Sequence, residues 1–139
     1  MGRIIERRPG SAGAPQTAGI VPLWIVLPGN LLGRARDVKI LPERIAHIRE
    51  RRPKWLAFCL THIPEALAAP DYIGQAARGD RRRVDFVRLV GRPSRWLLVS
   101  VKFLDDRSEA WVNSAYPIAD SYLTRRVRKG SLWRAAREP

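Results

Sequence analysis

His47 is the side chain in this sequence best suited to move a proton. A helix is expected from Pro42 to about Arg52, and on it His47 lies about 120° from the centre of the apolar stripe. Arg44 and Arg51 share that side of the helix, three residues before His47 and four after it. Two guanidinium groups beside an imidazole could hold a phosphate while the histidine acts as a general base. The alternative is a half-exposed helix histidine among solvated charges.

The sequence has few of the other motifs on which catalytic sites are built. Its 139 residues include two histidines and one cysteine, without an HxxxH, CxxC or DxD cluster for a metal ion. It also lacks a Walker loop, a GxGxxG motif and a G-x-S-x-G elbow, so neither a metal nor an organic cofactor is expected. RNA cleavage suits such a composition because the 2′-hydroxyl of the substrate is the nucleophile. The protein then supplies a base, an acid and cations for the charged phosphorane.

Lys102 is a second candidate, because it lies in the strongest strand pattern of the chain, Arg95 to Leu104. Alternation in this strand separates an apolar face from a mixed face that carries Lys102 and Trp96. With Trp111 of the next strand, this mixed face could stack bases and bind phosphate. The alternative is a solvated sheet face on which the lysine stem packs against tryptophan.

Two further polar residues are expected to be structural. His62 ends a buried helix, where it can satisfy the terminal carbonyl groups. Cys59 lies between Phe58 and Leu60 and is expected to be a small core residue.

The net charge of the chain points to a polyanionic partner. Lys and Arg number 26 against 13 Asp and Glu, which gives a formal charge of +13. The excess is spread along the chain, and 22 of the basic residues are Arg, which suits bidentate phosphate contacts. Nucleic acid is therefore the first expected partner, and an acidic protein or a membrane surface the second. The single cysteine fits a reducing compartment, and we expect a cytoplasmic bacterial protein without a membrane span.

Residues 1–19 mix Arg, Pro, Gly, Ser and Ala without periodicity, so we expect a flexible basic leader there. A single α+β domain is expected over residues 20–139. The expected strands are 20–27, 37–41, 84–90, 95–104 and 109–116. The expected helices are 42–52, 54–62 and 65–69, and a last one that starts at Asp120 or Ser121 and stops at Gly130.

Short segments in a fixed order resemble the phage-associated nuclease domains grouped as barnase–EndoU–colicin–RelE-like. Residues 37–53 resemble their opening strand, the following His-Ile and the Arg-x-Pro end of the helix. Residues 63–74 resemble their hydrophobic helix with Pro-Asp-Tyr-Ile. Residues 84–88 and 96–103 resemble their central strands, 114–118 their Thr-x-Tyr-Pro strand end, and 129–132 their basic close. The match spans about residues 37 to 134.

This resemblance implies N-terminal helices packed on a four-stranded antiparallel sheet, with metal-independent RNase chemistry on the sheet face away from the helices. The catalytic positions that match are His47, Lys102, Ser114 and Tyr116. The cations assigned to RNA phosphates are Arg44, Arg51, Arg52, Arg125, Arg126 and Lys129. Two positions depart from the family pattern: Arg52 stands where a second histidine is common, and Ser114 where threonine is common.

The expected pairing of the last two long strands conflicts with this site. If residues 105–108 form a four-residue loop, position 102 faces 111 and position 99 faces 114. Ser114 and Tyr116 then lie on the core face, opposite Lys102. A bulge, or a loop of different length, would move both to the Lys102 side, and a site at the strand end near Tyr116 is the other solution.

The sequence therefore predicts a metal-independent endoribonuclease that cleaves by 2′-hydroxyl transesterification. A non-enzymatic module that binds nucleic acid through the same Arg and Trp side chains is the alternative. A third possibility is a phage accessory or antitoxin-like protein with an acidic partner, and an acidic immunity protein or antitoxin could accompany a nuclease as well.

Overall fold

The computed structural model describes residues 14–28, 36–76, 79–104 and 109–136 of the chain. The described strands are β1 (Gln16–Ile20), β2 (Asp37–Ile40), β3 (Tyr72–Gly74), β4 (Arg83–Val90), β5 (Arg95–Leu104), β6 (Glu109–Ile118) and β7 (Leu132–Arg134). The described helices are α1 (Pro42–Arg51), the 3-10 turn η3 (Pro53–Trp55), α2 (Leu56–Ala68) and α3 (Asp120–Arg128).

All seven described strands form one mixed sheet in the order β1-β2-β6-β5-β4-β3-β7. Every neighbouring pair is antiparallel except β2 and β6, which run parallel. The protein is α+β, but the expectation of a four-stranded antiparallel sheet that follows N-terminal helices is wrong. Two strands precede the first helix, and three short strands widen the sheet at its edges. Strands of three to five residues are too short to show a clear alternation in the sequence.

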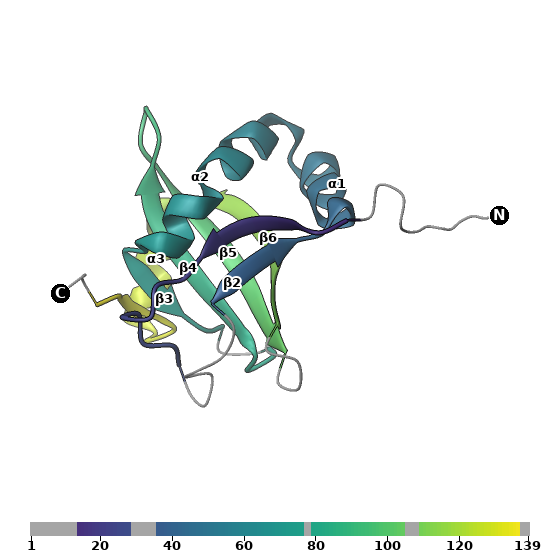
Figure 1. The fold of residues 1–139 in the computed structure, drawn as a ribbon. Coiled ribbons are helices and arrows are strands. Elements are labelled where there is room, and N and C mark those ends of the chain that lie inside the picture. Colours follow the sequence, from purple (N-terminus) through teal and green to yellow (C-terminus); the bar gives the residue numbers. More distant parts are fainter. Residues whose placement is uncertain (1–13, 29–35, 77–78, 105–108, 137–139) are drawn as a thin grey trace.

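The helices divide between the two faces of the sheet (Figure 1). α1 and α2 pack on one face, and the main core lies between them and the sheet. α3 covers part of the opposite face, which we call the α3 face, over a smaller apolar cluster of Val87, Leu98, Leu123 and Leu132.

Helix α2 is one continuous helix, whereas the sequence predicted two pieces separated at Pro64. The residues that α2 buries, Cys59, Ile63, Ala66 and Leu67, form a stripe at helical spacing that runs past the proline. Burial of this stripe on the sheet outweighs the hydrogen bond that Pro64 cannot donate.

The N-terminal boundary of the domain also differs from the expectation. Residues 16–19, assigned to the leader, belong to β1, where Ala18 is buried and Gly19 approaches Leu67 of α2. Residues 1–13 of the expected leader lie outside the described residues. The expected strand over 20–27 is wrong except at Ile20: residues 21–28 form turns and bends, and the amide of Ile25 donates to the carbonyl of Pro22.

The central strands and two of the helices are confirmed closely. β4, β5, β6 and α1 lie within two residues of their expected bounds. α3 ends as expected before Gly130, whose φ of +80° suits the left-handed conformation that glycine adopts readily. The expectation that Asp120 or Ser121 caps α3 is wrong: the N-cap is Ala119, and the Asp120 carboxylate accepts a 2.7 Å hydrogen bond from Trp96 Nε1 instead.

Candidate functional site

A β-bulge at Asn113 decides which face of the sheet carries the predicted site. Ser100 pairs with Ser114, but the next residue of β5, Val101, pairs with Val112, so Asn113 is left over. The extra residue shifts the alternation of β6 and brings Ser114 and Tyr116 onto the face that carries Lys102. Of the two solutions that the sequence left open, the bulge is the one that the structure adopts.

Arg44 of α1 satisfies the backbone at this bulge. Helix α1 lies against β6, and Arg44 Nη1 donates to the carbonyl oxygen of Asn113 at 3.4 Å. His47 follows one helical turn later and is half-buried. Among the described contacts, none joins His47 to Ser114, Tyr116 or Lys102, so α1 and β6 are adjacent but the predicted catalytic side chains are not in one hydrogen-bonded group.

Tyr116 lies at the centre of a polar cluster between α1 and α3. The guanidinium carbon of Arg52 lies 4.7 Å from the centre of its ring, a cation–π contact. Burial raises the pKa of the Tyr116 hydroxyl, and the neighbouring Tyr122 and Asp85 raise it further. The phenol is therefore protonated at neutral pH and available as a hydrogen-bond or proton donor.

Arg126 anchors α3 to the sheet. Its guanidinium donates to Asp85 Oδ2 at 3.0 Å, to Tyr122 Oη at 3.2 Å, and to the hydroxyl and carbonyl of Ser131 at 2.6 and 3.2 Å. Burial lowers the pKa of this guanidinium, but the Tyr122 hydrogen bond and the charge of Asp85 outweigh burial and raise it overall. Most of the donors of Arg126 are thus engaged within the protein, so few are left for the phosphate that the sequence assigned to this residue.

A row of three polar residues, buried at Ser100 and Asp85 and half-buried at Ser114, crosses the sheet beneath this cluster. Ser114, Ser100 and Asp85 are register partners on β6, β5 and β4. Ser100 is 3% exposed, and its hydroxyl has no hydrogen-bond partner among the described residues. An unpartnered buried hydroxyl is costly, and it is often found where a ligand or a water completes a site.

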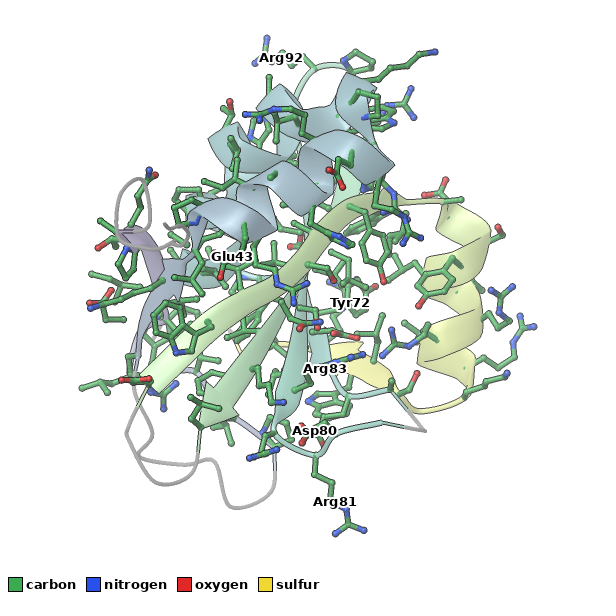
Figure 2. The ribbon with its side chains drawn as sticks, turned by 90° about the vertical axis from the view of Figure 1, so that its right-hand side faces the viewer. Glu43, Tyr72, Asp80, Arg81, Arg83 and Arg92 are labelled. Atoms are coloured by element: carbon green, nitrogen blue, oxygen red, sulfur yellow. The ribbon has the colours of Figure 1, made fainter. Side chains whose placement is uncertain are left out.

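Lys102 lies at the other end of the α3 face, where Figure 2 shows Arg83 and Asp80 close together. Its ammonium group forms a 3.1 Å ion pair with Asp80 Oδ2, which also contacts Arg82. Trp111 is the register partner of Lys102 and is half-buried, so it remains a candidate for base stacking. Trp96 is not: it packs in the small cluster beneath α3 and donates to Asp120.

The remaining predicted cations are exposed to solvent. Arg125 is exposed and stacks over the ring of Tyr122 at 5.4 Å, while Arg51 and Lys129 are exposed on α1 and after α3. The structure thus brings together Arg52, Tyr116 and Arg126, and places Ser114 nearby on the same face. Lys102 lies apart from them, because the row of Ser114, Ser100 and Asp85 crosses the sheet between Lys102 and Tyr116.

Sequence reasoning missed Asp85, Tyr122, Ser100 and Asp80 as members of this region. Two of them left a signal. Asp85 is the one acidic position inside the apolar strand 84–90, and Tyr122 precedes Arg126 by one helical turn.

His62 and Cys59 have structural roles, although His62 does not cap carbonyl groups as expected. Its Nδ1 pairs with Glu65 on the same helix, and its ring packs on Phe58. Cys59 is fully buried with its thiol on the carbonyl of Ala115, and burial raises its pKa to about 11.

The part of the chain that the structure describes contains no group of three or more His, Cys, Asp or Glu residues that could hold a metal ion. No helix among the described residues is long and apolar enough to cross a membrane. Comparison with protein-family models, curated proteins and solved structures finds no match to this chain.

Proposed function

We propose that the protein binds RNA on the α3 face and cleaves it by transesterification without a metal ion. The observation that carries this proposal is the bulge at Asn113, because it gathers Ser114, Tyr116 and Lys102 on one face, beside Arg52. In such a reaction the 2′-hydroxyl gives its proton to a base and its oxygen bonds to phosphorus. The bond from phosphorus to the 5′-oxygen breaks, the leaving oxygen takes a proton, and a 2′,3′-cyclic phosphate remains.

Each role can be given to a residue whose chemistry fits it. Tyr116 keeps its proton at neutral pH, so it is the candidate donor to the leaving oxygen. His47 on α1 is the candidate base, since α1 is fastened to the bulge by Arg44 one turn earlier. Arg52 would offset the charge of the phosphorane, and the hydroxyl of Ser114 could bind one of its oxygens. Lys102, farther along the same face, would bind a neighbouring phosphate of the RNA.

A binding module without catalysis is the second candidate function. Two observations favour it. The described contacts do not join His47 to Tyr116, and the N–H groups of Arg126 donate to residues of the protein itself. In this reading the same cations and Trp111 hold phosphate and stack bases.

One assay separates the two functions. Purified protein is incubated with a mixed RNA pool in excess EDTA, and the ends of any fragments are identified. The nuclease proposal predicts fragments with 2′,3′-cyclic phosphate and 5′-hydroxyl ends. RNA that is bound but stays intact would support the binding module instead.

A further inference from the structure

We propose that Lys102 and Arg82 form a separate phosphate-binding site at the end of the α3 face, which the carboxylate of Asp80 fills while no RNA is bound. This inference rests on the proposed function only in that RNA supplies the phosphate. It assigns to Asp80 the part of an internal competitor for a backbone phosphate.

The contacts of Asp80 are those that a bound anion would make. Its Oδ2 lies 3.1 Å from Lys102 Nζ and 3.1 Å from Arg82 Nη2, and its Oδ1 accepts from Arg82 Nε at 3.1 Å. The guanidinium of Arg82 thus grips both carboxylate oxygens side by side while the lysine adds a point charge. The same fork and the same ammonium bind two oxygens of a phosphate equally well.

The site is open to solvent. The side chains of Asp80, Lys102 and Arg82 are 29%, 37% and 41% exposed. Arg83, the register partner of Lys102, adds a further cation on β4, and Trp111 flanks the lysine on β6. Figure 2 shows Arg83 and Asp80 on the same side of the sheet, with Arg81 projecting beyond them. A phosphate here would therefore have cations on two sides and an aromatic ring beside it for a base.

The negative charge of Asp80 is not needed for the turn in which it lies. Asp80 Oδ1 accepts from the backbone N–H of Arg82 at 2.9 Å, and its carbonyl accepts from the N–H of Arg83 at 2.9 Å. An asparagine could accept both hydrogen bonds, because Asx turns form equally with Asn and Asp. What the carboxylate adds is its charge, and that charge is directed at Lys102 and Arg82.

The competition does not depend on pH near neutrality. Hydrogen bonds from Arg82, and then from Lys102, lower the pKa of Asp80 well below its usual range, so the carboxylate stays ionised. Only another anion can take its place. The cost of breaking these ion pairs is small because they are exposed, so an RNA phosphate can displace Asp80.

The test compares Asp80→Asn with Glu50→Gln, which raises the net charge by the same amount on the exposed side of α1. The probe is a fluorescein-labelled 2′-O-methyl single-stranded oligonucleotide, which cannot be cleaved at its 2′-oxygen, and its affinity is measured by anisotropy over a range of KCl concentrations. Asp80→Asn is expected to bind about three- to tenfold more tightly than wild type, as the loss of exposed ion-pair competition allows. Its salt slope should be steeper by about 0.7 if one more phosphate is contacted. Glu50→Gln should change the affinity much less.

A second variant keeps the test sharp. Adding Lys102→Ala to Asp80→Asn should remove the gain in affinity, and thermal melting should show that all three variants fold. The inference is overturned if Asp80→Asn binds no more tightly than Glu50→Gln, or if the gain survives the loss of Lys102. The outcome is independent of cleavage: tighter binding without nuclease activity would sink the proposed function alone, and cleavage without tighter binding would sink this inference alone.

Discussion

Arg52 and Arg126 both lie beside tyrosines of the α3 face, but they have different tasks. Arg126 has its donors tied to Asp85, Tyr122 and Ser131, so it holds α3 in place. Arg52 lies after α1 with its guanidinium over the Tyr116 ring and no ion pair among the described contacts. Arg52 can therefore bind a phosphate without the displacement of a carboxylate.

His47→Ala tests the proposed base. General acid–base catalysis by one side chain contributes about 10²–10⁴-fold, so the variant should lose that much cleavage rate under single-turnover conditions. RNA affinity should stay close to that of wild type, because the arginines hold the phosphates. His62→Ala is the matched control. His62 pairs with Glu65 on α2, so this variant should cleave RNA at the wild-type rate. If His47→Ala cleaves as fast as wild type, another group takes the 2′-proton.

At the scale of elements, α3 is attached to the sheet through one buried ion pair and a small apolar cluster. The side chains of Arg126 and Asp85 are 11% and 7% exposed. The position of α3 on the sheet therefore depends on an ion pair between Arg126 of the helix and Asp85 of β4.

Arg126→Ala should destabilise the protein by about 3–5 kcal/mol, because it leaves the buried Asp85 carboxylate without its partner. Arg125→Ala, one residue away but exposed, should cost less than about 1 kcal/mol, the value of an exposed cation–π contact. Urea unfolding followed by tryptophan fluorescence measures both free energies of unfolding. Equal losses for the two variants would mean that the ion pair does not anchor α3.

The long elements could be predicted from the sequence, and the short ones could not. Alternation over β4 and β5 and helical spacing over α1 each repeat often enough to show their period. β3 and β7 have three residues each, and they owe their place to pairing with β4 and with each other. A pattern of that length carries no period.

The bulge explains why the sequence could suggest Ser114 and Tyr116 as site residues but could not show on which face of the sheet they lie. The buried positions of β6 are Ala110, Val112 and Ala115, a spacing of two and then three. The sequence alone does not show which break in alternation is a bulge, because Asn113 and Ser114 suit either face. Asp85, Tyr122 and Ser100 gain their meaning only from strands and a helix that are distant in the sequence.

At the scale of the whole molecule, a charge of +13 predicts binding that depends strongly on salt. The logarithm of the RNA affinity should fall with the logarithm of the salt concentration, with a slope of about −0.7 for each phosphate contacted on a single strand. Titration of labelled RNA at several KCl concentrations measures this slope. An affinity that is the same at low and high salt would contradict a nucleic-acid surface altogether.

The central claim is that the α3 face around Tyr116 performs RNA cleavage, and one pair of variants tests it most directly. Tyr116→Phe removes a hydroxyl from the proposed site, and Tyr72→Phe makes the same change on β3, where Arg134 covers the ring. Single-turnover cleavage of a defined RNA in EDTA is measured for both. We predict a loss of about 10²–10⁴-fold for Tyr116→Phe and a nearly unchanged rate for Tyr72→Phe. Equal cleavage rates for the two variants would contradict the account.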